Sequence, residues 1–219
     1  MLELLPISPS TVFNGPWDGV IPREDKNTLF RMHTFSTVQD IKDKGPNAIG
    51  VTNTGATVGS DSKGSYMYFS GNSFLSFTSP ILDGNSYNIT MILGDVGYPT
   101  QAIYDTTLLD GRPDIVNGRY LTVGIRKDPP FLSTLSFQSQ GNNGQETVPD
   151  NQFPIVMRVE VRPGIFRVFS NGKKIQEWSF PDNTMAGSAP WRLGRNAFRQ
   201  QAQTPGYMGK LYYIDFKKV

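Results

Sequence analysis

Apolar and polar residues alternate with a period of two along several short stretches, most clearly in residues 156–162, VMRVEVR. Successive side chains of a strand point to opposite faces, so this pattern predicts a half-buried antiparallel strand. Its apolar face holds Met157, Val159 and Val161, and its polar face holds Arg158, Glu160 and Arg162. Pro163-Gly164 and Asn171-Gly172 follow, and Asn-Gly accepts the positive φ that a tight turn requires. Two consecutive hairpins are therefore expected here.

Further short strands are predicted along the chain, separated by clusters of Asn, Gly, Asp and Pro. They are NTLFRMHTF, YMYF, FLSF, YNITMIL, YLTVGI, LSTLSF and the closing GYMGKLYYIDF. In YNITMIL, a core-facing stripe of Tyr87, Ile89, Met91 and Leu93 alternates with Asn88 and Thr90, which are expected outside. At most Ser36 to Asp43 is compatible with a short helix. The sequence predicts an all-β single domain of two packed antiparallel sheets.

The first residues of the chain have a different character. Four prolines interrupt any regular element: Pro6, Pro9, Pro16 and Pro22. Trp17 lies in the turn sequence NGPWDG. We expect residues 1–24 to form an extended N-terminal arm and residues 25–219 to form the sandwich. Trp17 is expected to anchor the arm to the sandwich or to a neighbouring subunit, and a ligand platform is its alternative role.

Charge and composition remove several classes of function. The formal net charge is +2 and no basic cluster extends along the chain, so nothing points to a nucleic-acid partner. The apolar runs are too short to span a bilayer, so no membrane partner is expected. Cysteine is absent, which excludes disulfide and thiolate chemistry. The opening residues, MLELLPISPSTVF, lack a basic region and do not resemble a signal peptide, so we expect folding in the cytoplasm.

The segments resemble, in order, the laminin-G-like and concanavalin A-like jelly rolls. The resemblance rests on DKNTLFRMHTF, GSYMYFSGNSFLSF, YNITMIL, RVFSNGKKI, WRLGRN and GYMGKLYYIDF, and it covers about residues 25 to 219. It implies a two-sheet jelly-roll sandwich whose closing strand bends at Gly209 and pairs beside the first strand. Lectins, glucanases, adhesive modules and virion proteins all use this sandwich, so the resemblance indicates a fold more firmly than a function.

As a stand-alone unit without cysteine, the sequence looks most like the laminin-G-like proteins among tailed-phage structural proteins. That resemblance implies a non-enzymatic module of a virion, of the capsid-decoration or tail-adhesin type, assembled in the host cytoplasm. Its expected partners are capsid or tail proteins, further copies of itself, and a surface glycan. The alternative is a carbohydrate-binding lectin module that acts alone or is attached to an enzyme.

Carboxylates give little support for catalysis. Glucanases of this fold carry their acids on one strand as E-x-D-x-x-E, because alternate positions share a face, and no such run occurs here. Glu146, Glu160 and Glu177 stand apart from other acids. A glycan hydrolase or lyase stays as a third alternative, which would require Asp105 to meet a second acid such as Asp110 in one cleft.

Metal and cofactor chemistry is equally sparse. The single histidine, His33, cannot build a multi-histidine zinc site and is expected to be packed or hydrogen-bonded within a strand. No cofactor motif occurs, and no metal site is assigned. Calcium stays an alternative, because loop oxygens of the required type occur at Asp83, Asn85, Asp110 and Asp114.

A binding loop is predicted between residues 98 and 120. Sugar binding requires a flat aromatic surface and planar hydrogen-bonding groups, and long loops between rigid strands are where binding tends to occur. The candidate glycan-binding residues are Tyr98, Tyr104, Asp105, Arg112, Asp114 and Tyr120. The competing interpretation is that the tyrosines pack on the core and the charges keep the loop soluble. Together with Trp17, a second polar patch supplies candidate assembly contacts at Arg195, Asn196 and Arg199.

Overall fold

The computed structural model describes residue 21 and residues 24–79, 86–96, 106–110, 121–128, 132–139, 142–149, 154–179, 191–195 and 206–219. Across these segments the chain is built from strands, with one 3-10 turn, η1 (Val38–Asp40). Almost all of the predicted arm, residues 1–24, lies outside the described residues, so the arm and its boundary stay predictions.

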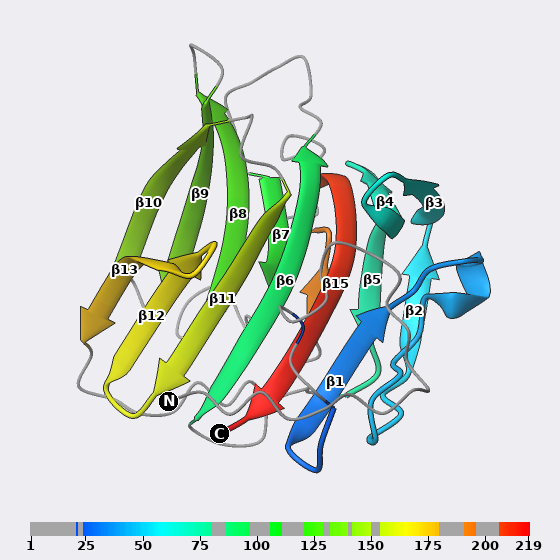
Figure 1. Cartoon of the computed structure of the whole chain (residues 1–219), viewed down its shortest axis with the longest axis horizontal. Coiled ribbons are helices and arrows are strands. Elements are labelled where there is room, and N and C mark those ends of the chain that lie inside the picture. Colours follow the sequence, from blue (N-terminus) through cyan, green and yellow to red (C-terminus); the bar gives the residue numbers. More distant parts are fainter. Residues whose placement is uncertain are drawn as a thin grey trace.

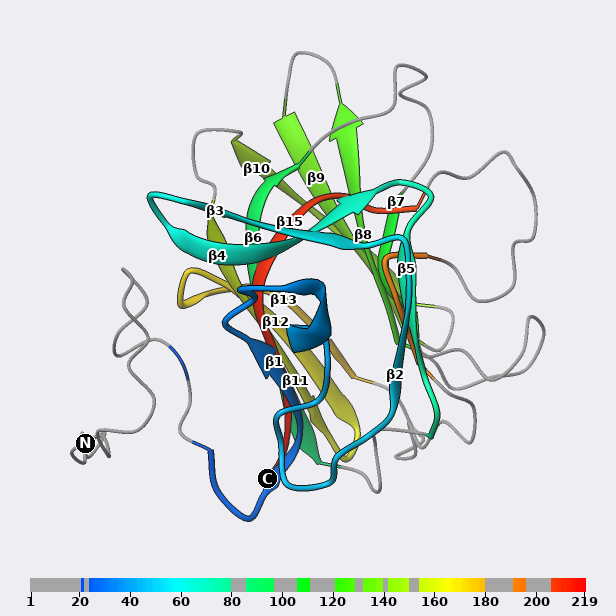
Figure 2. The ribbon, with the colours of Figure 1, turned by 90° about the vertical axis from the view of Figure 1, so that its right-hand side faces the viewer.

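The strands form two antiparallel sheets that face each other, as Figures 1 and 2 show. Sheet A contains β13 (Lys173–Ser179), β12 (Ile165–Ser170), β11 (Ile155–Arg162), β6 (Tyr87–Val96), β15 (Met208–Lys218), β4 (Gly64–Ser70) and β3 (Thr57–Asp61), in this order, with β1 (Thr28–His33) also paired to β15. Sheet B contains β10 (Asn142–Pro149), β9 (Leu132–Ser139), β8 (Leu121–Asp128), β7 (Thr106–Asp110), β14 (Arg192–Leu193), β5 (Phe74–Phe77) and β2 (Val51–Thr54). The predicted all-β jelly-roll sandwich is confirmed.

Strand β15 lies in the middle of sheet A rather than at its edge (Figure 1). One side of β15 pairs with β6. Its other side pairs first with β4, through residues 208–211, and then with β1, through residues 213–217. The predicted pairing of the closing strand beside the first strand is therefore confirmed. The register against β6 shifts between Gly209 and Leu211, which agrees with the bend predicted at Gly209.

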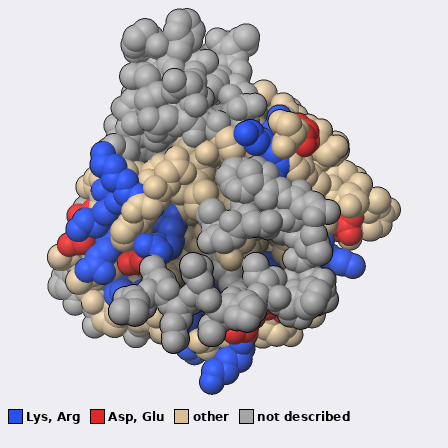
Figure 3. All heavy atoms as spheres, viewed as in Figure 1, with Lys and Arg blue, Asp and Glu red and all other residues tan. Residues whose placement is uncertain are grey.

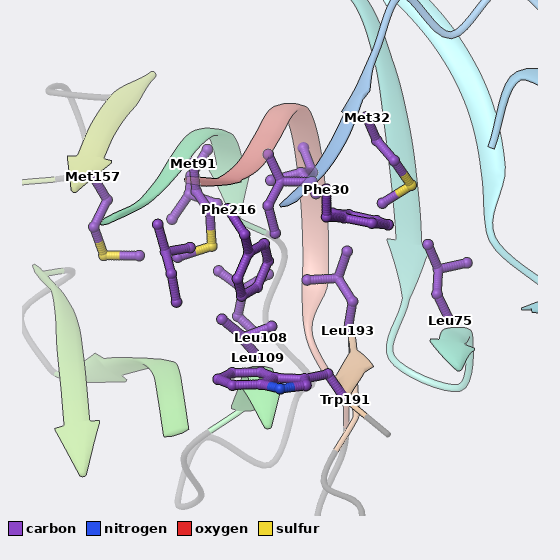
Figure 4. Close-up of a cluster of buried hydrophobic side chains, with 14 of the residues drawn as sticks. Phe30, Met32, Leu75, Met91, Leu108, Leu109, Met157, Trp191, Leu193 and Phe216 are labelled. Carbon is purple, nitrogen blue, oxygen red and sulfur yellow. The ribbon is translucent and has the colours of Figure 1, made fainter. Parts of the chain in front are cut away.

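The period-two stripes of both sheets meet in one core. The apolar face predicted for β11 is fully buried, as is the stripe predicted for β6. Aromatic contacts join the two sheets: Phe30 lies edge-on to Phe77 at 4.9 Å, and Trp191 lies edge-on to Phe216 at 5.4 Å between ring centres. Figure 4 shows the indole of Trp191 beneath Phe216. Burial of each such side chain stabilises the fold by about 1.5–3 kcal/mol.

The predicted turns agree with the structure, and the predicted helix is shorter than its window. Asn171 and Gly172 both have positive φ, 48° and 81°, as a tight hairpin turn requires. Within 36–43 only η1 forms, because the backbone leaves the helical conformation at Ile41, where ψ is 76°. At the start of η1 the Asp40 carboxylate accepts hydrogen bonds from the backbone N–H groups of Ser36 and Thr37 at 3.0 and 2.8 Å. This capping satisfies the start of a single turn.

Thr90 points outward as predicted but is buried, with only 4% of its surface exposed. It lies between Asp215 of β15 and Arg158 of β11, its Cα partners on either side, and its side chain is close to the buried Asp215 carboxyl group. The same outer face holds a second apolar cluster, formed by Ile92, Tyr212 and Tyr213. Ile21, which precedes β1, packs against this cluster. The centre of sheet A is consequently covered on both of its faces.

A buried ion pair lies beside this outer cluster. Arg31 of β1 is the Cα partner of Asp215 of β15, and their side chains approach to 3.4 Å between Nη2 and Oδ2. Asp215 is fully buried and Arg31 is 6% exposed. Burial raises the pKa of Asp215 above its ordinary value, and the attraction of Arg31 offsets only part of that effect.

His33 confirms the packed histidine that the sequence predicts. Its ring stacks on Tyr213 at 6.4 Å between centres, and its Nδ1 lies 2.9 Å from the hydroxyl oxygen of Thr34. Burial lowers the pKa of His33 to about 4, and repulsion by Lys44 and Arg31 adds to this effect. The imidazole is therefore neutral at pH 7.

Replacement of Arg31 by methionine should destabilise the fold by about 3–5 kcal/mol at pH 7, because it leaves the buried Asp215 carboxylate without its counter-charge. The pKa of Asp215 is raised in the folded state. The stability that protonated Asp215 contributes is therefore fully present below the pKa of this group in the unfolded chain. It is lost as the pH rises through the pKa of Asp215 in the folded protein. The loss of unfolding free energy in Arg31→Met should accordingly be smaller near pH 4 than at pH 7.

Denaturant unfolding at both pH values measures this difference. The control is Arg158→Met, because the side chain of Arg158 is 44% exposed. An equal deficit for Arg31→Met at pH 7 and pH 4 would contradict the assigned role of the ion pair.

Candidate functional site

The structure leaves most of the predicted site residues undescribed. The six glycan-binding candidates, Tyr98, Tyr104, Asp105, Arg112, Asp114 and Tyr120, all lie outside the described residues. So do Trp17, Asn196 and Arg199 of the assembly candidates, and Asp83, Asn85 and Asp114 of the calcium candidates. Arg195 is the one site candidate whose surroundings are described, and it lies beside Phe74 at the end of β14. These predictions are otherwise untested.

A different aromatic surface occurs on the outer face of sheet A, where β3, β4 and β15 lie side by side. We call it the tyrosine platform, and it consists of Tyr66, Tyr68, Lys210, Tyr212 and Asp61. Tyr66 and Tyr68 point outward because Met67 and Phe69, which alternate with them, are fully buried. Tyr68 is the Cα partner of Lys210 across the ladder. Both tyrosines are half-buried, so each keeps part of its surface open to solvent.

Two glycines let the tyrosine rings lie close against the sheet. Tyr66 is the Cα partner of Gly59, and a Cβ added to Gly59 would lie 2.7 Å from the Tyr66 ring. A Cβ at Gly94 of β6 would likewise lie 2.6 Å from the Tyr212 ring. Any larger residue at either position would have to displace a ring. A glycine inside a strand marks such a close approach.

Hydrogen bonds fix the polar side of the platform. The Tyr212 hydroxyl donates to Asp61 Oδ2 at 2.8 Å, and Lys210 Nζ donates to the same oxygen at 2.7 Å. The Lys210 ammonium also lies 4.7 Å from the centre of the Tyr66 ring, which is a cation–π contact. The Tyr66 and Tyr212 rings meet edge-on at 5.7 Å. The aromatic and charged groups therefore hold one another in place.

Asp61 is charged at neutral pH. Partial burial acts to raise the pKa of Asp61, but hydrogen bonds from Lys210 and Tyr212 outweigh burial and hold this pKa below its usual value. A carboxyl group in this state is a hydrogen-bond acceptor rather than a general acid. Glycoside hydrolysis requires a second carboxyl group at a defined distance, and Asp61 is the one acid of the platform.

The platform has the chemistry of a binding surface. Tyrosine presents an apolar ring face together with a polar hydroxyl. Among the described residues, nothing hydrogen-bonds to the hydroxyl of Tyr66 or of Tyr68. A sugar ring also has one apolar face of C–H groups and a rim of hydroxyls, so it matches ring faces beside an ammonium and a carboxylate. Within the described segments, no group of three metal-ligating side chains forms.

The sequence predicted strands for the three tyrosines and Lys210 but not a binding surface. It predicted a Gly/Ser/Thr-rich loop up to Ser65, and this is wrong, because Asp61 ends strand β3. One feature of the sequence could have revealed the platform. Tyr66 and Tyr68 alternate with apolar residues, and a glycine, Gly59, lies in the segment just before them. The sequence does not show that β15 lies beside this hairpin, which brings Lys210 to Asp61 across 149 positions of the chain.

The rest of the outer face of sheet A carries paired charges. Lys and Arg gather, with Asp and Glu between them, over β11–β13 on the left of Figure 3. Arg167 Nε lies 2.8 Å from Glu177, and Arg158 Nη2 lies 3.1 Å from Glu160. Exposed pairs of this kind contribute little to stability, and we interpret them as a solvated face.

Comparison with known proteins identifies a shared fold. No protein-family model matches the chain, and no curated protein matches it. The chain is similar to domain 4 of AbnA, a GH43 extracellular arabinanase from Geobacillus stearothermophilus, in complex with arabinotriose. The TM-score is 0.63 at 16% identity, over 88% of this chain and 92% of that chain.

Two further structures are similar over part of their length. One is botulinum neurotoxin type C, whose cell entry depends on interaction with two ganglioside molecules (TM-score 0.58, 11% identity, 88% of this chain, 49% of that chain). The other is the enzymatically active domain of Bacteriophage CBA120 tailspike protein 2 (TM-score 0.55, 11% identity, 78% of this chain, 29% of that chain). At these identities the likeness shows the β-sandwich fold.

In the described segments, no helix is long and apolar enough to cross a membrane.

Removal of either donor to Asp61 should move its pKa upward. In Lys210→Met the carboxylate loses a hydrogen bond and a nearby positive charge, and in Tyr212→Phe it loses a hydrogen bond. Carboxyl-carbon NMR titration should show both pKa values closer to that of an isolated aspartate, with the larger change in Lys210→Met. Lys42→Met should leave the titration unchanged. An unchanged pKa in Lys210→Met would mean that the platform is not assembled as described.

Proposed function

We propose that the protein is a non-enzymatic glycan-binding module that attaches to a larger assembly. The tyrosine platform carries this proposal, because it combines two partly exposed aromatic side chains with a charged donor and a charged acceptor on a rigid sheet. Two features of the neighbours support it. One neighbour is a domain in complex with arabinotriose, and another protein depends on gangliosides for cell entry.

The assembly that we favour is a virion of tailed-phage type, with the protein as a capsid-decoration or tail-adhesin component. The likeness to a phage tailspike domain supports this setting. The protein would be made in the host cytoplasm, would attach to capsid or tail proteins, and would act in several copies. Several copies on one particle multiply a weak sugar affinity without any new contact.

A lectin module attached to an enzyme is the second candidate. The observation that favours it is the match to domain 4 of the arabinanase, which extends over 92% of that domain. Both candidates use the same mechanism, the binding of a glycan on a β scaffold, and they differ in what the module is attached to.

Glycan-array binding tests the role of the platform. Tyr68→Ala should lower the affinity for the bound glycan at least about tenfold, which corresponds to about 1.4 kcal/mol. Gly59→Ala is the sharper variant, because it keeps every polar and aromatic group and only displaces the Tyr66 ring. Ser60→Ala in the same strand and Phe169→Ala, a half-buried aromatic at the other end of sheet A, should bind normally.

The same array separates the platform from the predicted loop. If Tyr104→Ala and Arg112→Ala abolish binding while Tyr68→Ala and Gly59→Ala do not, the site is the loop and the platform proposal is wrong. The absence of binding to any glycan by the intact protein would favour a purely structural role. Turnover of an arrayed polysaccharide would overturn the non-enzymatic proposal.

Attachment is tested by truncation of residues 1–20, which keeps Ile21 on its apolar cluster. The truncated protein should unfold at the same denaturant concentration and bind glycan as before, but it should no longer be incorporated into the particle that carries the full chain. Quantification of the protein in purified particles measures this. Full incorporation of the truncated protein would rule out attachment through the arm.

A further inference from the structure

The outer face of sheet B contains a second aromatic and charged surface, on the other sheet from the tyrosine platform. Phe74 of β5 and Arg192 of β14 point outward, because Leu75 and Leu193, which alternate with them, are fully buried. Arg195 follows two residues after β14. The guanidinium carbons of Arg192 and Arg195 lie 5.6 and 5.7 Å from the centre of the Phe74 ring. One phenylalanine thus has two cations against it.

The other arginines whose side chains are described all have polar partners within the chain. Arg31 pairs with Asp215, Arg158 with Glu160, and Arg167 with Glu177. Arg162 donates to the carbonyl of Tyr87 and to Asn88 Oδ1. Among the described residues, neither Arg192 nor Arg195 forms an ion pair. Both are half-buried rather than fully exposed. Guanidinium groups held on an aromatic ring without a carboxylate partner are well suited to accept an anion from outside the protein.

Hydrogen bonds to two other segments hold the backbone between Arg192 and Arg195 in place. Gly194, between the two arginines, has a φ of 93°. Its N–H donates to the carbonyl of Leu108 at 2.6 Å, and its carbonyl accepts from the N–H of Tyr207 at 2.9 Å. A Cβ at Gly206 would lie 2.3 Å from the Gly194 carbonyl oxygen, so the two segments pass in close contact. Arg192 and Arg195 therefore project from a backbone that is ordered before a ligand binds, which reduces the entropy lost on binding.

Polar side chains continue from Arg192 onto the two neighbouring strands β5 and β2. Residues directly opposite each other in antiparallel ladders share a face of the sheet. Ser76 is the Cα partner of Arg192, and Thr52 is the Cα partner of Ser76. Neither hydroxyl residue is buried. Leu75 and Leu193, which are also Cα partners, alternate with them and are fully buried in the core.

We propose that this face of sheet B binds an acidic polysaccharide, a glycan chain that carries carboxylate or sulfate groups. Arg192 and Arg195 bind an acidic group beside Phe74, and the hydroxyl groups of Ser76 and Thr52 bind sugar hydroxyls next to it. A nucleic acid fits this arrangement less well. It presents a phosphate at every nucleotide and requires many cations in line, whereas the described cations of this surface are Arg192 and Arg195 and the chain has a net charge of +2.

The test is titration calorimetry of the full chain with defined polymers. Polygalacturonate and alginate provide carboxylates, dextran sulfate provides sulfates, and neutral arabinan and dextran provide hydroxyls alone. The intact protein should bind at least one acidic polymer and prefer it to both neutral ones. Comparison of the carboxylate arm with the sulfate arm identifies the acidic group.

Variants locate the binding. Arg192→Gln and Arg195→Gln should each weaken binding of the acidic polymer about tenfold or more, because each loses a charge-assisted hydrogen bond. Arg192→Lys should recover only part of the loss, because lysine keeps the charge but not the planar guanidinium. Arg158→Gln on sheet A is the matched control and should bind like the intact protein. Tyr68→Ala should also bind the acidic polymer normally, which separates this site from the tyrosine platform.

Three outcomes would overturn the proposal. Equal binding of neutral and acidic polymers would show that the arginines do not select the ligand. An equal loss in Arg158→Gln and Arg192→Gln would indicate general attraction to a positive protein. Tighter binding of a single-stranded DNA oligonucleotide than of every acidic polysaccharide would assign the face to nucleic acid. Unfolding midpoints of all variants should match that of the intact protein, since the replaced arginines lie on the surface.

Discussion

The pairing of β15 with strands on both of its sides is the interaction on which the rest of the structure depends. β15 joins β6 to the pair of β4 and β1, so it connects segments from the beginning, the middle and the end of the described chain. Its inward residues Leu211, Ile214 and Phe216 belong to the main core. Its outward residues Tyr212 and Tyr213 form the outer cluster. A single strand therefore supports both faces of sheet A.

A bulge in β15 allows its apolar and polar residues to reach the correct faces of sheet A. Strict alternation from Leu211 would place both Tyr213 and Asp215 in the core. The register against β6 shifts between Leu211 and Tyr213, and such a bulge reverses which residues face inward. Ile214 and Phe216 then enter the core, and Asp215 meets Arg31 on the outer face. Tyr212, which follows the inward Leu211, points outward before the shift takes effect, and its hydroxyl donates to Asp61 in the tyrosine platform.

The local part of the fold was readable from the sequence, and the long-range part was not. Alternation identified β6 and β11, and Asn171-Gly172 identified a hairpin, because these signals depend on neighbouring residues. Thr90 was correctly placed outside but is buried, because its cover comes from segments distant in the sequence. The tyrosine platform escaped prediction for the same reason, since Lys210 and Asp61 meet only after β15 has joined β4. The predicted glycan-binding loop lies outside the described residues and is neither confirmed nor contradicted.

The central place of β15 also determines when the sandwich can assemble during synthesis. Strands β1, β4 and β6 leave the ribosome well before β15, yet each of them pairs with it. Until β15 emerges, these three strands have open hydrogen-bonding edges that other chains can pair with. Contacts between segments so far apart in the sequence also form slowly. The nascent chain is thus most prone to aggregation just before this segment appears, and a chaperone that covers exposed strands would act most usefully in that interval.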